Sequence, residues 1–169
     1  AIDEAFPVLA ELRSQGIVKA IGVGMNQGQL LTKLAIYGYF DCFLLAGRYT
    51  LVDHSGLVEL LPLSSNRNIS VIIGGPYNSG ILASNLSSEA MYFYSHAPHE
   101  VLERTRRIKA ICDNFKVPLK AAALQFGLLH PAVASTIPGS RSVSEIKENL
   151  QMIEYPIPCD FWSHLKRVQ

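Results

Sequence analysis

The chain has 169 residues, 49% hydrophobic and 17% charged, which is typical of one soluble globular domain with a sizeable core. The net charge of +1 comes from scattered residues, so we expect small partners rather than nucleic acid or a membrane. Cys42, Cys112 and Cys159 form no C-x-x-C pair, and no long apolar run or basic leader occurs, which predicts a reduced, cytoplasmic protein.

The first part of the chain alternates between helical and strand patterns. Apolar residues recur at helical spacing at Ile2, Ala5, Phe6, Leu9 and Leu12. Gly16 is placed to end this helix in the left-handed conformation. A buried strand at 17–24, a helix at 27–38 and a second buried strand at 39–47 follow. Because the helical pattern is already running at residue 1, which is not Met, we expect a cut end.

The second part continues this alternation with one long interruption. Leu57, Leu60, Leu61 and Ser64 predict one face of a third helix, and the unbroken apolar strand at 69–75 is typical of a sheet covered on both faces. Residues 83–97, rich in Ser, Asn and Tyr, are too long to be a mere connector.

The remaining segments predict four helices and one strand. The predicted order is a helix from Val101 to Phe115, a helix at 118–130, a strand at 132–139, and helices at 142–153 and 158–168. Glu103 and Arg107 are expected to pair one turn apart, and Ser142 and Glu145 have capping-box spacing. This alternation predicts a parallel α/β sheet, either doubly wound or part of a barrel, with residues 1–169 in a single domain.

Ligands of parallel sheets collect where strands end, and two such ends are informative. Gly139, Ser140 and Arg141 precede a capped helix, so backbone donors and a guanidinium could form a phosphate site there, although an ordinary turn is as good an interpretation. Gly74, Gly75 and Pro76, with Tyr77, Asn78 and Ser79, could admit a ring or a sugar, against the simpler interpretation of a glycine-requiring turn.

The histidines carry less weight. His96 and His99, with Glu100 and Glu103 nearby, are interpreted as residues around a helix start at Pro98 rather than as metal ligands, so no metal site is assigned. We assign no functional role to His54, His130, His164 or Tyr49. The residues themselves provide no Ser/His/Asp, Cys/His or paired-carboxylate arrangement. The sequence therefore indicates a ligand-binding site but no catalytic group.

Taken together, several stretches resemble the carboxyl-terminal part of the aldo-keto reductases, most closely the group of D-threo-aldose 1-dehydrogenases, L-fucose dehydrogenases and pyridoxal 4-dehydrogenase-like enzymes. The stretches are AIGVGMNQ, DCFLLAGRYTLVD, VIIGGPYNSGIL, AALQFGLLHPAVASTIPGSRSVSEIKENL and PIPCDFWSHLK, and the resemblance covers essentially the whole chain. It implies a (β/α)₈ TIM barrel, of which this chain supplies about strands 5 to 8 with their helices, as the C-terminal portion of one barrel domain.

The resemblance also implies where a nicotinamide dinucleotide, NAD or NADP, would lie. It assigns the nicotinamide and pyrophosphate to Gly74, Gly75, Pro76, Tyr77, Asn78, Ser79 and Gly80, and the carboxamide to Asn26. Ala46 stands near where relatives have a carboxamide-binding glutamine. It assigns the adenosine half of the cofactor to Gly139, Ser140, Arg141, Glu145, Glu148 and Asn149. Asn149 would contact the adenine, and Arg141 the 2′-phosphate or the adenosine face.

The family's catalytic aspartate, tyrosine, lysine and histidine would lie before residue 1, so the resemblance assigns no catalytic residue to this chain. It implies an NAD(P)-dependent dehydrogenase that oxidises an aldose such as L-fucose to its lactone, with the missing amino-terminal half of the barrel as partner. Half a barrel alone would expose an apolar sheet edge, which predicts a part of a longer polypeptide, inactive by itself. Alternatives are pyridoxal as substrate, a nucleotide-binding pseudoenzyme or regulatory barrel, or a short protein that acts through its sheet edge.

Overall fold

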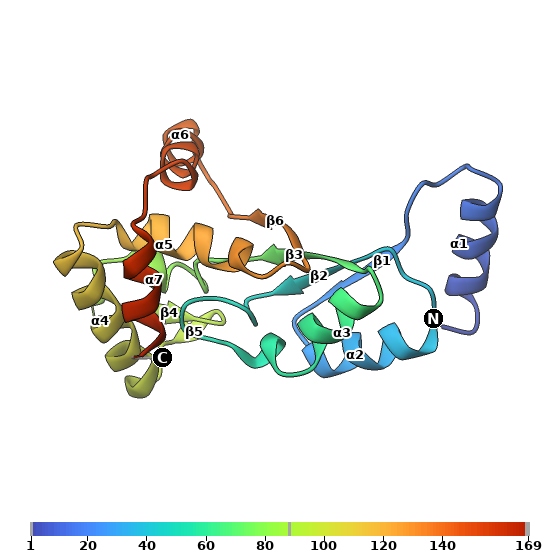
Figure 1. Ribbon diagram of the computed structural model, residues 1–169, viewed down its shortest axis with the longest axis horizontal. Coiled ribbons are helices and arrows are strands. Elements are labelled where there is room, and N and C mark those ends of the chain that lie inside the picture. The colour runs from blue at the N-terminus through green and yellow to red at the C-terminus, as the bar shows by residue number, and fades with distance from the viewer. Residues whose placement is uncertain (1, 88, 168–169) are drawn as a thin grey trace.

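The computed structural model describes residues 2–87 and 89–167. Its centre is a parallel four-stranded sheet in the order β1-β2-β3-β6 (Figure 1). The strands are β1 (Gly22–Met25), β2 (Cys42–Ala46), β3 (Ser70–Gly74) and β6 (Val133–Ile137). All three pairs of neighbouring strands are parallel, so the four carboxyl ends lie at one edge of the sheet. The predicted parallel α/β architecture is confirmed.

The described helices precede, connect and follow the strands. They are α1 (Ala5–Ser14), α2 (Gly28–Tyr37), α3 (Leu60–Asn66), α4 (His99–Asn114), α5 (Leu119–Phe126), α6 (Val143–Ile153) and α7 (Cys159–Lys166). Gly16 has a φ of 73°, so it follows α1 in the predicted left-handed conformation. The helix expected at 118–130 ends at Phe126 and continues as a 3₁₀ turn. The helix expected at 158–168 ends at Lys166, and residue 168 lies outside the described residues.

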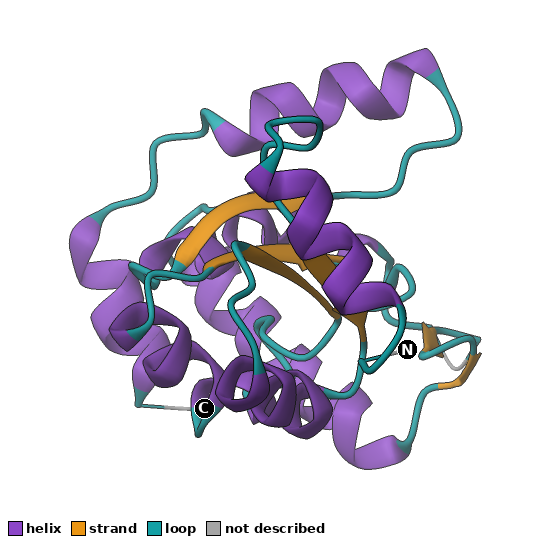
Figure 2. Ribbon diagram, turned by 90° about the vertical axis from the view of Figure 1, so that its right-hand side faces the viewer, coloured by secondary structure: helices purple, strands orange, loops and turns teal. Residues whose placement is uncertain are grey.

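The sheet is curved (Figure 2), and its two faces differ in burial. Phe43, Leu45, Val71 and Ile73 are fully buried in the cluster shared with the helices. Leu44 and Ile72, on the opposite face, remain partly exposed. The expectation of cover on both faces is therefore wrong for the described residues, because the helices bury only one face.

Two other predictions need correction. The strand expected at 17–24 is shorter and not buried, because β1 has only β2 as a neighbour and alternates between exposed and partly exposed residues. Leu57 does not belong to the third helix; it is 40% exposed in a separate 3₁₀ turn. Pro62, which lacks an N–H, fits only the first turn of a helix, so α3 begins at Leu60.

The long excursion at 83–97 contains a small hairpin, β4 (Met91–Tyr92) and β5 (Ser95–His96). His99 begins α4 directly after Pro98, as the helix-start interpretation predicted. On α4, Glu103 pairs with Arg106 rather than with Arg107. No helix in the described ranges is long and apolar enough to cross a membrane.

Candidate functional site

A cleft of about 670 Å³ opens where β3 and β6 end. Because these strands are parallel neighbours, the segments that follow them start side by side, residues 75–80 after β3 and residues 139–149 after β6. The cleft is lined by Gly75, Tyr77, Asn78, Ser79, Gly80, Ala83, Tyr94, Lys120, Gly139, Ser140, Arg141, Glu145, Glu148 and Asn149. It therefore unites the two segments that the sequence singled out separately.

Three of the predicted site residues do not line this cleft. Gly74 is the buried last residue of β3, where a Cβ would come within 2.9 Å of Cδ2 at the flexible end of the Leu44 side chain. Pro76 is also buried. Asn26 lies beyond the end of β1, two strands away along the same edge. An elongated ligand would have to continue along the strand ends to reach it.

The turn after β3 has an unusual backbone. Asn78, Ser79 and Gly80 have φ values of 45°, 57° and 95°, three successive left-handed residues. Within the turn, the Asn78 N–H donates to the Gly75 carbonyl and the Gly80 N–H to the Tyr77 carbonyl, each at 3.0 Å, while the Ser79 N–H makes no hydrogen bond among the described residues. The Asn78 side chain donates to the carbonyl of Gly47 at 3.0 Å, which ties the turn to the end of β2, while its buried Oδ1 has no hydrogen-bond partner among the described residues.

The segment after β6 is shaped by the start of α6. Ser142 Oγ accepts the Glu145 N–H at 3.2 Å, as the capping-box spacing predicted. The Glu145 carboxylate, however, accepts the N–H of Arg141 at 2.6 Å rather than that of Ser142. Gly139 has nothing within 4 Å of where a Cβ would stand, and its φ does not require glycine, so its missing side chain leaves open space in the cleft.

A chain of hydrogen bonds joins the two segments across the cleft. The Tyr77 hydroxyl donates to Asn149 Oδ1 at 2.6 Å, and Asn149 Nδ2 donates to Ser140 Oγ at 2.9 Å. Burial, and then the nearby carboxylate of Glu148, raise the pKa of Tyr77, so its hydroxyl stays protonated and remains a donor at neutral pH. Both polar atoms of the Asn149 amide are thus engaged within the protein.

Sequence reasoning missed three residues of the cleft. Lys120, near the start of α5, pairs with Glu148 at 2.7 Å. Tyr94, at the tip of the β4–β5 hairpin, is 89% exposed and donates its N–H to Ser79 Oγ at 3.1 Å, and Ala83 follows the turn after β3. A lysine in the first turn of a helix, where cations are disfavoured, was the one available signal for Lys120.

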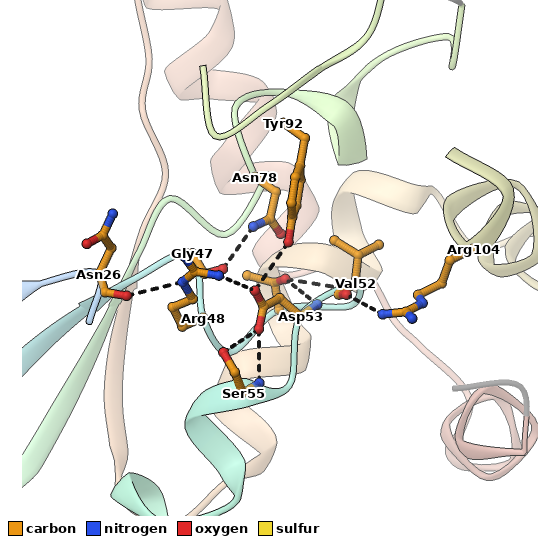
Figure 3. A network of polar contacts seen from close by, with 10 residues as sticks. Asn26, Gly47, Arg48, Val52, Asp53, Ser55, Asn78, Tyr92 and Arg104 are labelled. Atoms are coloured by element: carbon orange, nitrogen blue, oxygen red, sulfur yellow. Dashed lines mark hydrogen bonds and ion pairs between the residues drawn. The ribbon is translucent and has the colours of Figure 1, made fainter. Parts of the chain in front are cut away.

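A second polar network holds the hairpin against the end of β2 (Figure 3). Arg48 donates through Nε to the Asn26 carbonyl and pairs with Asp53, each at 3.1 Å, and its guanidinium lies 4.2 Å from the centre of the Phe93 ring. Tyr92 donates its hydroxyl to the same carboxylate at 3.2 Å. Arg48 thus links the end of β1, the loop after β2 and the hairpin tip.

Asp53 stays ionised in this network. Burial acts to raise the pKa of its carboxyl group, but hydrogen bonds from the Ser55 hydroxyl and N–H, together with Arg48, outweigh burial and lower the pKa. Burial, and then Asp53, raise the pKa of Tyr92 to about 12. The carboxylate therefore accepts and the phenol donates at neutral pH.

The chain is similar to known proteins over its whole length. A model of the aldo/keto reductase family matches residues 1–169. Pyridoxal 4-dehydrogenase of Microbacterium luteolum is 43% identical over 95% of this chain and 47% of its own length. D-threo-aldose 1-dehydrogenase of Pseudomonas sp is 36% identical over 98% of this chain and 50% of its own length. The chain thus spans about half the length of these curated relatives.

A solved structure shows the same fold. An aldo-keto reductase from Bacillus halodurans in its apo form superimposes with a TM-score of 0.78 at 22% identity, over 99% of this chain and 56% of that protein. The described strands and helices therefore form part of a (β/α)₈ barrel. This confirms the barrel alternative over an open doubly wound sheet.

Proposed function

Because the chain belongs to the aldo/keto reductase family, we propose that it is the cofactor-holding part of an NAD(P)-dependent oxidoreductase. The observation that carries the proposal is the single cleft in which the segments after β3 and β6 meet, joined by Tyr77, Asn149 and Ser140. The bound nicotinamide would accept or supply a hydride.

The residues present suit such a cofactor. In the turn at 78–80, the Ser79 N–H has no partner among the described residues and can donate to a pyrophosphate, and the orphaned Asn78 Oδ1 can accept a hydrogen bond from a ligand. The open space at Gly139 allows a ligand to approach the backbone closely. Asn26 would hold the nicotinamide end farther along the strand ends, and the segment from Gly139 to Asn149 would hold the adenosine end.

For the substrate, we propose a cyclic hemiacetal, with an aldose such as L-fucose first and pyridoxal second. The 36% identical relative is named for an aldose and the 43% identical one for pyridoxal. Both compounds carry an aldehyde carbon within reach of their own hydroxyl group. Removing a hydride from the ring-closed carbon and a proton from its hydroxyl leaves a lactone, and the proton needs a general base. By the family resemblance, that base lies before residue 1.

The test uses the protein at its natural length, whose intact mass is measured first. A mass well above 18.6 kDa would show that further chain is present. Cofactor affinity is then measured, followed by NADH or NADPH production with L-fucose and with pyridoxal. Turnover with either compound supports the proposal, and the compound that is oxidised identifies the substrate. Binding without turnover would favour a pseudoenzyme, and absence of binding would overturn the proposal.

A variant tests the cleft itself. Gly139→Leu should fill the open space and weaken binding of both cofactors by at least about tenfold, since a side chain that occupies a binding pocket costs more than about 1.4 kcal/mol. Ser65→Leu, at an exposed position on α3 outside the cleft, is the matched control and should bind as the parent does. Equal affinity in both variants would contradict this assignment of the cleft.

A further inference from the structure

We infer that the cleft selects a dinucleotide without a 2′-phosphate, NAD rather than NADP, and that Glu145 and Glu148 set this preference. The inference rests on the proposed function, because it assumes that the adenosine half of the cofactor occupies the α6 end of the cleft. It concerns which member of the cofactor pair binds there, which family membership alone leaves open.

The charged side chains that line the cleft cancel one another. Two are cations, Lys120 and Arg141, and two are carboxylates, Glu145 and Glu148, so their formal sum is zero. Lys120 is already neutralised by its 2.7 Å ion pair with Glu148. A dinucleotide brings two negative charges in its pyrophosphate, and a 2′-phosphate would add about 1.5 to 2 more. The described lining has no surplus of cations to balance them.

Two of the backbone donors beside the start of α6 are already engaged. Exposed N–H groups at a helix start are the usual anion site, but at α6 the Arg141 N–H is held by the Glu145 carboxylate at 2.6 Å. The Glu145 N–H is held by Ser142 Oγ at 3.2 Å. The Glu145 carboxylate therefore lies at the start of α6, and a phosphate that approached there would meet a like charge.

Arg141 is the remaining cation of the cleft, and its charge suits a different part of the cofactor. Among the residues that the structure describes, its guanidinium makes no hydrogen bond or ion pair. A planar, weakly hydrated guanidinium stacks well on a flat ring. We therefore place Arg141 on the face of the adenine, where it contributes to NAD and NADP alike.

The experiment compares the dissociation constants of NADH and NADPH for the natural-length protein, measured by titration without substrate. We expect NADPH to bind at least about tenfold more weakly than NADH, a difference of about 1.4 kcal/mol. Glu145→Gln keeps an oxygen that can accept the Arg141 N–H but removes the charge. It should improve NADPH affinity by about five- to tenfold and change NADH affinity by less than about twofold.

Glu154→Gln is the matched control, because Glu154 is exposed and directly follows α6, outside the cleft. The affinities of this variant for both nucleotides should equal those of the parent. The preference should also shrink as salt rises from about 0.05 to 0.5 M, since screening weakens charge repulsion. Equal or tighter binding of NADPH by the parent, or an unchanged NADPH to NADH ratio in Glu145→Gln, would overturn the inference while leaving the proposed function intact. If neither nucleotide binds, the proposed function itself fails, and the inference with it.

Discussion

At the scale of single residues, one phenol determines how the two ligand-facing segments are joined. Tyr77 comes from the turn after β3, and Asn149 comes from α6, 72 positions later in the chain. Because the Asn149 amide also donates to Ser140, the Tyr77 hydroxyl fixes which way that amide points. A ligand in the cleft therefore meets a preorganised wall, which reduces the ordering cost of binding.

Tyr77→Phe should loosen this wall. Losing the hydroxyl leaves Asn149 Oδ1 without its donor, so we expect a loss of about 1 kcal/mol in the free energy of unfolding and about three- to tenfold weaker cofactor binding. Urea unfolding and nucleotide titration measure the two effects. Tyr155→Phe is the matched control, since that hydroxyl bonds to the Lys116 carbonyl outside the cleft. A similar loss of affinity in both variants would argue against a specific role for Tyr77.

The residues of the cleft differ in how far they could be predicted. Gly139 to Arg141 and Tyr77 to Gly80 follow strand ends, so the order of elements is enough to mark them. Lys120 could not be found in that way, because it reaches the cleft only through the packing of α5 beside α6. The hydrogen bonds of Asn149 likewise depend on tertiary distances that spacing along the chain does not contain.

At the scale of elements, the β4–β5 hairpin shows a local conformation that its own residues do not favour. Phe93 and Tyr94 have φ values of 47° and 63° in a two-residue turn, where Asn and Gly are preferred. The turn is held from outside, by the Arg48 guanidinium against Phe93, by Ser79 at the Tyr94 N–H and by Asp53 at the Tyr92 hydroxyl. Patterns predicted the helices well because apolar periodicity is local, whereas this hairpin carries no turn signal.

Asp53→Asn should release the hairpin. The substitution removes the ion pair with Arg48 and weakens the acceptor for Tyr92, so we expect a loss of about 1.5 to 3 kcal/mol in the free energy of unfolding at pH 7. Faster amide hydrogen exchange at residues 91–96 would locate the effect. Asp113→Asn is the matched control; it removes only the exposed ion pair with Lys109 and should cost less than about 1 kcal/mol.

The same substitution predicts a pH dependence. The folded pKa of Asp53 lies below the ordinary value of about 3.9, so its contribution is present above about pH 4 and is lost as pH falls through the lower, folded pKa. The difference in unfolding free energy between parent and Asp53→Asn should therefore shrink as pH falls below about 4. A difference that stays constant down to about pH 2 would contradict the proposed ionisation of Asp53.

At the scale of the whole molecule, the described sheet has two edges and a partly open face. β1 and β6 each pair with one neighbour, whereas in a closed barrel every strand has two. α6 stands away from the sheet in both views (Figures 1 and 2). None of its residues is buried, and its apolar Val143, Ile146 and Leu150 are exposed. These surfaces are the ones that further barrel strands and helices would cover.

Residues 1–169, produced alone, should therefore self-associate. Unpaired strand edges can pair with strands of other chains, and a neighbouring apolar face strengthens this association. We therefore expect concentration-dependent oligomers in size-exclusion chromatography with light scattering. Ile137, which ends the edge strand β6, is 50% exposed. Ile137→Lys should shift the oligomers towards monomer, since a lysine at an edge discourages strand addition, whereas Leu128→Lys, equally apolar but in the turn after α5, should not. A monodisperse parent that unfolds cooperatively would show instead that these four strands form an independent unit. If the exposed edge promoted association, oligomers would form at high protein concentration.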